Sequence, residues 1–327
     1  MPSVRAVVSV PLIAAACATG AADPVVVEPA PTLTPGDHAF TLEYEGRTRA
    51  YLVHVPTAVA SGEALPVVLA FHGGGGNAAQ FKGSAGLDAV AEREGVLAVY
   101  PDGTGLAGLH TWNAGPRCCG SARDQDVDDV GFVRAVVADL VARTPVDAER
   151  VFATGHSNGG GMSYRIAHDA PEFVAAVAPV GGAAMGPVAT TADPVPLLHI
   201  HSVDDPRALY DGGLGPPFPM TNHRVEHRAV PEVLAERADL NRCGGPPEVA
   251  ETIPAATVGR DAGHWAERLV WPGCTAPLEH WRLHGPGHGW PGHRQNRARE
   301  QIVGPSTLIL SAADEAWRFF AAVAGAG

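Results

Sequence analysis

The sequence predicts an α/β protein with a doubly wound, mostly parallel sheet and helices on both faces. Short apolar segments alternate with longer amphipathic ones along most of the chain, and this alternation is typical of such a sheet. The apolar segments also run without polar interruption, as strands buried on both faces do. The chain has 327 residues, of which 46% are hydrophobic, and shows neither an internal repeat nor a second linker. We therefore expect a single domain over residues 38–327.

The elements follow one another in a regular order. Residues 38–56 predict a hairpin with its turn at Glu45 and Gly46, and "LPVVLAFHGGGG" at 65–76 predicts a buried strand that ends in glycines. The further expected strands are 96–101, 151–154, 173–181, 196–202, 266–271 and 278–283. The expected helices are 87–94, 131–143, 160–170 and 306–322.

The first 37 residues resemble an export signal followed by a tether. Arg5 supplies a positive charge, residues 6–16 are apolar, and small residues follow. Cys17 fits the lipid-bearing cysteine of a bacterial lipoprotein, except that Ala14 stands where leucine is usual. A plain secretory signal over 1–17 and an N-terminal helix of the fold are the alternatives. The stretch 18–37 is expected to be a flexible, Ala/Pro-rich tether.

The charge balance excludes one class of partner. The formal net charge is −12, Lys82 is the only lysine, and no polybasic run occurs. Such a chain lacks the positive surplus that neutralises phosphates, so a nucleic-acid partner is not expected. Membrane contact is expected only through a lipid on Cys17, and no protein partner is implied.

The remaining cysteines are Cys118, Cys119, Cys243 and Cys274. Four cysteines in an exported chain favour disulfides, and the sequence permits three pairings. We favour Cys243 with Cys274, which closes a loop in the C-terminal half. Cys118 and Cys119 are then either a bonded neighbouring pair or free thiols.

The pattern G-H-S-N-G around Ser157 has the form of a nucleophile elbow. In a chain with 39 glycines the pattern also arises by chance, so its context decides. An apolar segment precedes it and an amphipathic one follows, as a sharp strand-to-helix turn requires. Gly155 and Gly159 leave the turn free of bulky side chains. Ser157 is therefore the candidate nucleophile, with an ordinary turn serine as the alternative.

Two backbone amides are candidates for an oxyanion hole. The segment "FHGGGGN" at 71–77 follows a predicted strand and is of the glycine-rich type described for lipases and esterases. We expect the amide of Gly74 to be one donor and the amide of Asn158, at the start of the following helix, to be the other. No G-K-[ST] follows the glycines, which disfavours a phosphate-binding loop.

A serine nucleophile needs a base, and the base needs an orienting carboxylate. Asp204 and Asp205 follow the predicted strand 196–202, and we favour Asp205. His288 lies in a Gly-Pro-Gly loop after the next late strand, which matches the chain order Ser, acid, His of this kind of hydrolase. The other candidate bases, which lack this position, are His264, His280, His284 and His293.

Six ordered motifs together resemble the secreted polyhydroxybutyrate depolymerase and feruloyl esterase family of α/β-hydrolases. They are "FHGGGGN", "TWNAGPRCCG", "VDDVGF", "GHSNGGGMSY", "HSVDDP" and "GHGWPG", spread over residues 66–292. The resemblance implies the α/β-hydrolase fold. Its H-G-T-x-D pattern places the acid on Asp205, and its G-H-x-W-P-G pattern places the base on His288. Ser202 and Val203 replace the usual Gly-Thr, and the family's late cysteine pair resembles Cys243 and Cys274.

Other features carry weaker predictions. Trp112 and Trp290 are candidates for the wall of an apolar acyl or aryl pocket, with core packing as the alternative for Trp112. The acidic run 124–129 lacks the glycine and the distal glutamate of a calcium loop. It is better explained by stabilisation of the next helix start. No spacing of His, Cys or Glu indicates a catalytic metal, and no cofactor is expected.

The expected activity is hydrolysis of carboxylic esters through Ser157, His288 and Asp205. Feruloyl or other aryl esters, acetylated polysaccharide and short hydroxyalkanoate oligomers all fit as substrates. An acyltransferase, a peptidase and a non-catalytic surface lipoprotein that binds ligands are the alternatives.

Overall fold

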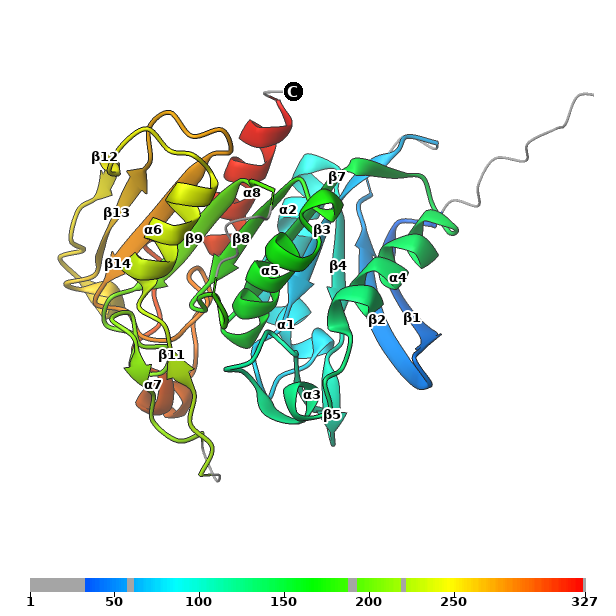
Figure 1. Cartoon of the computed structure of the whole chain (residues 1–327), viewed down its shortest axis with the longest axis horizontal. Helices are drawn as coiled ribbons and strands as arrows, with labels where there is room; N and C mark the ends of the chain where they lie inside the picture. The colour runs from blue at the N-terminus through cyan, green and yellow to red at the C-terminus, as the bar shows by residue number, and fades with distance from the viewer. Residues whose placement is uncertain (1–32, 58–61, 188–192, 219–221, 326–327) are drawn as a thin grey trace, which may run out of the picture.

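The computed structural model describes residues 33–57, 62–187, 193–218 and 222–325. Its main feature is a ten-stranded sheet in the order β1-β2-β4-β3-β7-β8-β9-β14-β13-β12 (Figure 1). The expected signal segment, Cys17 and most of the expected tether lie outside the described residues. The strands of this sheet are β1 (Gly36–Tyr44), β2 (Arg47–Val55), β3 (Leu65–Phe71), β4 (Leu97–Pro101), β7 (Val146–His156), β8 (Ala176–Val180), β9 (Leu197–Ser202), β12 (Glu248–Ile253), β13 (Trp265–Val270) and β14 (Leu278–His284).

The centre of the sheet is parallel and its two ends are antiparallel. Strands β4, β3, β7, β8, β9 and β14 pair in parallel. The pair β1–β2 is added antiparallel at one end and β13–β12 at the other. This arrangement confirms the predicted doubly wound sheet, and it brings the carboxyl ends of the parallel strands to one edge.

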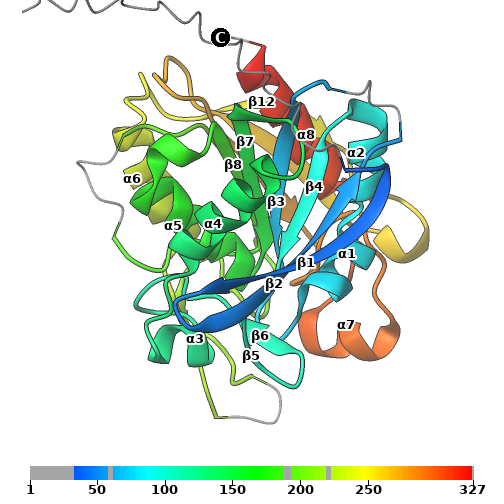
Figure 2. The ribbon, with the colours of Figure 1, turned by 90° about the vertical axis from the view of Figure 1, so that its right-hand side faces the viewer.

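Helices cover both faces of the sheet. Along β3, Val67, Leu69 and Phe71 face one core cluster, whereas Val68 and Ala70 face the other. This period of two follows from the pleat of a strand. The first cluster is closed by α4 (Asp129–Val141), α5 (Asn158–Asp169) and α6 (Val230–Leu240), and the second by α1 (Ala78–Ala85), α2 (Leu87–Glu94) and α8 (Ala312–Ala324) (Figure 2).

Most of the expected elements are present, with shifted ends. The hairpin turns at Glu45 and Gly46, both with positive φ. The last helix begins at Ala312 rather than at residue 306, because the Ser311 side chain caps it there. The N-terminal strand begins at Gly36, so the end of the expected tether belongs to the sheet. Elements that the sequence analysis did not expect are α1, α6, β12, the hairpins β5 (Thr104–Leu106) with β6 (Leu109–Thr111) and β10 (Gly213–Leu214) with β11 (Glu226–His227), and the short helices α3 (Gly120–Asp124) and α7 (Arg297–Val303).

Four of these unexpected elements lie beyond the carboxyl edge of the sheet. Strands β5 and β11 and helices α3 and α7 lie below the sheet in Figure 1.

In the described part of the chain, no helix has both the length and the apolar character needed to span a membrane.

Candidate active site

Ser157 lies at a sharp turn between β7 and α5, with φ 57° and ψ −116°. This left-handed backbone is costly for a residue with a side chain and is typical of a nucleophile elbow. A Cβ atom on Gly155 would lie 2.5 Å from the carbonyl oxygen of Gly159, and one on Gly159 would overlap that of Phe71. The two glycines are therefore required by close backbone approach.

His288 and Asp205 lie beside this serine. The Ser157 hydroxyl is 2.8 Å from Nε2 of His288, and Nδ1 of His288 is 2.6 Å from Oδ2 of Asp205. Asp205 follows β9 and His288 follows β14, two neighbouring parallel strands whose carboxyl ends meet at this edge. The structure thus brings together the three side chains that the sequence analysis selected from distant segments.

Asp205 is buried and surrounded by donors. Its Oδ1 accepts hydrogen bonds from the amides of Arg207 (2.7 Å) and Ala208 (2.8 Å). Burial, the largest effect, by itself raises the pKa of this carboxyl. The charge of His288 and the hydrogen bonds from His201 and His288 outweigh it and hold the pKa below its ordinary value. The carboxylate is therefore ionised at neutral pH. Asp204 instead accepts a hydrogen bond from the Gly285 amide.

The glycine loop after β3 packs against the elbow. A Cβ atom on Gly73 would lie 3.5 Å from the Cβ of Ser157, and one on Gly74 would lie 3.4 Å from the Cβ of Asn158. Among the described residues, neither the Gly74 amide nor the Asn158 amide donates a hydrogen bond to another protein group. The side chain of Asn158 is held by both backbone groups of Trp112, at 2.7 and 3.0 Å. The side chain of Asn158 therefore has internal partners.

The two tryptophans do not line a pocket, so this expectation is wrong. Trp112 is fully buried and donates its indole N–H to the His72 carbonyl, 3.0 Å away. Trp290 is 4% exposed, donates to the Ala85 carbonyl (2.9 Å) and packs edge-on against Phe81. Each buries a large ring and satisfies its one donor internally. Trp112 thereby holds the start of the glycine loop, and Trp290 holds the end of α1.

Comparisons with known proteins show the family of this chain. The profile of the family described as "Esterase PHB depolymerase" matches residues 49–236. The chain belongs to this family. The protein described as "Putative esterase NocK" of Nocardia uniformis subsp. tsuyamanensis is 35% identical over 280 residues, which are 84% of this chain and 79% of that protein. The chain is therefore an esterase.

Other relatives extend the comparison. Feruloyl esterase B of Piromyces equi is 28% identical over 61% of this chain, but only 37% of that longer protein is matched. Among solved structures, the acetyl xylan esterase from Aspergillus awamori matches with a TM-score of 0.51 at 15% identity, over 81% of this chain and 97% of its own. That structural likeness shows the α/β-hydrolase fold.

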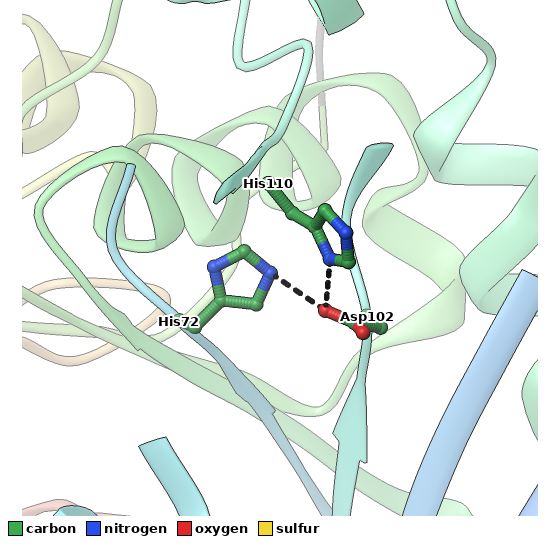
Figure 3. Close-up of side chains that lie close together, drawn as sticks. All are labelled: His72, Asp102 and His110. Atoms are coloured by element: carbon green, nitrogen blue, oxygen red, sulfur yellow. Dashed lines mark hydrogen bonds and ion pairs between the residues drawn. The ribbon is translucent and has the colours of Figure 1, made fainter. Parts of the chain in front are cut away.

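One cluster in this esterase has the residue types of a metal site. His72, Asp102 and His110 converge beside the glycine loop (Figure 3). Oδ1 of Asp102 lies 2.8 Å from Nδ1 of His110 and 3.3 Å from Nε2 of His72. However, Nε2 of His72 accepts the Gly103 amide at 3.0 Å, which uses the lone pair that a metal needs. The cluster is therefore better explained as hydrogen bonding that holds the loop.

A second such group, Asp37, His54 and Asp88, lies around a lysine. Lys82 is 2.9 Å from Asp37 and also pairs with Asp88. Its ammonium group already supplies the positive charge that a metal would bring.

The acidic run 124–129 stabilises local structure. The Asp128 side chain caps α4 by accepting the Gly131 amide at 2.9 Å, as expected for acidic residues at a helix start. Asp129 is fully buried, pairs with Arg49 at 2.7 Å and accepts the Asn113 amide at 2.8 Å. Both carboxylates therefore have internal partners.

Two disulfides are present among the described residues. Cys243 is bonded to Cys274, the favoured pairing. Cys118 is bonded to Cys119, one of the two states that the sequence left open. Cys118 also lies 3.5 Å from the Asn158 side-chain amide, so this pair adjoins the elbow.

The sequence analysis gave no role to the side chains behind Asp205, although His201 begins the quoted motif "HSVDDP". His199 and His201 are buried, and His201 lies 3.3 Å from Oδ2 of Asp205. The available signal was their spacing of two on the strand "LLHIHS", which places both rings on the same face of β9.

Proposed function

We propose that this esterase is an exported serine hydrolase in which Ser157, His288 and Asp205 form the catalytic triad. The observation that carries the proposal is the continuous hydrogen-bonded line from the Ser157 hydroxyl through His288 to Asp205, with distances of 2.8 and 2.6 Å. The strained backbone of Ser157 supports it, because such strain is kept where function requires it.

Each residue of the site has a separate role in the reaction. His288 takes the hydroxyl proton while Ser157 Oγ bonds to the ester carbonyl carbon. The amides of Gly74 and Asn158 stabilise the negative oxygen. Collapse breaks the bond to the alkoxy group, which receives the proton from His288. Water then attacks the acyl carbon with His288 again as base; the bond between this carbon and Ser157 Oγ breaks, Oγ takes the proton from His288, and the acid is released. Asp205 stabilises the imidazolium at each stage.

The relatives suggest the class of ester. Feruloyl esterases are among the matched proteins, and the family profile is that of a polyhydroxybutyrate depolymerase. Aryl esters such as ferulates, acetylated polysaccharide and short hydroxyalkanoate oligomers are therefore the proposed substrates.

Export is supported by the signal-like N-terminus and by the disulfide between Cys243 and Cys274. Mass spectrometry of the mature protein from its host tests it. We expect an N-terminus near residue 18, or a lipid on Cys17. An intact N-terminus on protein recovered from the cytoplasm contradicts export.

The test of the triad is Ser157→Ala assayed on methyl ferulate, p-nitrophenyl acetate and hydroxybutyrate oligomers. We expect kcat to fall by at least about 10⁴-fold, because removal of the nucleophile ends covalent catalysis. Ser163→Ala is the matched control. This buried serine lies on the same helix and bonds only the Gly159 carbonyl, so its variant should stay active. Retained turnover by folded Ser157→Ala contradicts the triad.

A further inference from the structure

A chain of buried polar side chains extends from Asp205 into the core. Oη of Tyr164, on α5, lies 3.0 Å from Nδ1 of His199, and Nε2 of His199 lies 3.1 Å from Nδ1 of His201. Nε2 of His201 lies 2.8 Å from the Ala208 carbonyl oxygen and 3.3 Å from Oδ2 of Asp205. Tyr164, His199 and His201 are each at most 3% exposed.

The chemistry of these groups fixes the direction of every hydrogen bond. The Ala208 carbonyl can only accept, so Nε2 of His201 carries a hydrogen. In a neutral imidazole Nδ1 of His201 then accepts, and it must accept from Nε2–H of His199. Nδ1 of His199 accepts in turn from the Tyr164 hydroxyl. Each donor in the chain therefore points towards Asp205.

The surroundings of His199 keep its imidazole neutral. Burial, followed by repulsion from His201 and His280, holds the pKa of His199 well below its ordinary value. A neutral His199 has one donor and one acceptor nitrogen, as the chain requires. In a low-dielectric interior, aligned hydrogen bonds of this kind polarise and strengthen one another.

We propose that His201, oriented by His199 and Tyr164, is a positioning residue for Asp205. The inference rests on the proposed triad. Nε2 of His201 donates to the carbonyl of Ala208 and lies 3.3 Å from the oxygen of Asp205 that also faces His288. The amide of Ala208 donates to the other oxygen of Asp205. Two hydrogen bonds through Ala208 and the short approach of His201 thus connect this imidazole to the carboxylate and to its loop.

The position of Asp205 matters because its carboxylate must accept a hydrogen bond from Nδ1 of His288. A misplaced or rotated Asp205 leaves the imidazolium without its partner at the moment that it forms. Groups that orient a reacting residue from behind typically contribute about 10- to 100-fold, as seen for the outer partners of metal ligands.

Other titratable groups face this chain from neighbouring elements. His280, on β14, donates to the His199 carbonyl and bonds the Tyr210 hydroxyl, both at 3.0 Å. From α6, Arg237 lowers the pKa of the Tyr164 hydroxyl, which burial raises more strongly. His227 and His288 face Asp205, and burial lowers the pKa of His227 to about 4.

His280 offers a matched control. It is as buried as His201 and lies against the same strand, yet its two nitrogens bond a backbone carbonyl and Tyr210 rather than Asp205. Loss of its imidazole therefore tests the general effect of removing a buried histidine.

The experiment measures kcat and KM for His201→Leu, His201→Gln and His280→Leu beside Ser157→Ala, with the thermal midpoint of each. We expect His201→Leu to lose about 10- to 100-fold in kcat with little change in KM. His201→Gln, whose amide can donate from near the position of Nε2, should recover most of that loss. His280→Leu should keep kcat within about threefold while losing comparable stability.

Two kinetic results overturn the inference. The first is His201→Leu with the kcat of the unaltered enzyme, and the second is a folded His201→Gln no better than His201→Leu. An equal loss of kcat in His280→Leu shows a merely structural role and also overturns it. Turnover retained by Ser157→Ala instead overturns the proposed triad. Failure of the triad can therefore be distinguished from failure of the inference about His201.

A second measurement needs no enzyme activity, so it tests the inference even if the His201 variants do not fold. Imidazole ¹⁵N chemical shifts of the full chain carrying Ser157→Ala report which nitrogen of His201 is protonated. We expect the Nε2–H tautomer, with Nδ1–H for neither His199 nor His201. An Nδ1–H tautomer of His201 reverses the chain and overturns the inference.

Discussion

Different interactions position the two sides of the proposed active site. On the nucleophile side, β3, β7 and the start of α5 contact one another through backbone, glycines and apolar side chains. On the acid–base side, β9 and β14 carry buried histidines that bond to one another and to Tyr210, which follows β9. Steric exclusion therefore fixes Ser157, whereas hydrogen bonding fixes Asp205.

This difference matches the task of each residue. Ser157 must hold an unfavourable φ of 57°, and close packing imposes it at every pH. Asp205 must stay charged inside the core, where only donors aimed at it can offset desolvation. Substitutions on the two sides should therefore have different effects on stability and on kcat.

The largest effect is expected from Gly159→Ala on the nucleophile side. The added Cβ would overlap the backbone carbonyls of Phe71 and His72, which cannot move without displacing β3. We expect the free energy of unfolding to fall by more than about 4 kcal/mol, measured by urea unfolding. Gly83→Ala is the control, because a Cβ there meets nothing within 4 Å. In a helix that change should be neutral or stabilising by up to about 1 kcal/mol. Equal stability of the two variants contradicts the steric account.

An intermediate effect is expected from the disulfide on the acid–base side. Cys243 and Cys274 are separated by 31 residues, and a loop of this length constrains the unfolded chain by about 3–4 kcal/mol. The double change Cys243→Ser and Cys274→Ser should lower the free energy of unfolding by about that amount. Cys274 precedes β14 and His288 follows it, so the disulfide and the site lie at opposite ends of this strand. The value of kcat should therefore be nearly unchanged. A large fall in kcat in the folded variant would show that the disulfide acts on the site.

The smallest effect is the contribution of one buried histidine to acid sensitivity. Burial lowers the pKa of His280 from 6.5 to about 3, so the folded protein keeps it neutral while the unfolded chain protonates it. The unfolded state thus binds more protons between about pH 6.5 and pH 3, and stability falls as the pH falls through that range. The slope for this one residue approaches about 1.4 kcal/mol per pH unit.

Urea unfolding at several pH values between 6.5 and 4 measures this slope. His280→Leu should flatten it by about 1 kcal/mol per pH unit, whereas Gly83→Ala should leave it unchanged. An unaltered slope in His280→Leu means that the histidine is not held neutral in the fold.

Sequence patterns predicted the central strands well because each is a continuous apolar run, as in 65–71. They missed β12, whose residues are mostly exposed, because an edge strand needs no apolar pattern. They missed α6 as well, although Pro231 lies in its first turn and is a typical helix start.

For the site, the motif spacing selected Ser157, Asp205 and His288, and the fold places all three within hydrogen-bond reach. The tryptophans were misjudged because a sequence shows an aromatic ring without showing what covers it. The chain from Tyr164 to His201 joins α5 to β9, and nothing local in either segment indicates the other.

The sequence by itself determined the order of strands and helices, the elbow with its two glycines, and the chemical types at the site. These are local properties, set by periodicity and by backbone sterics within a few residues. Only the tertiary structure decided between Asp204 and the favoured Asp205 as the partner of His288, and showed that Trp112 and Trp290 are buried and that His201 lies against Asp205. Those outcomes depend on the register of β9 beside β14 and on contacts between distant segments, where burial and hydrogen-bond geometry are settled together.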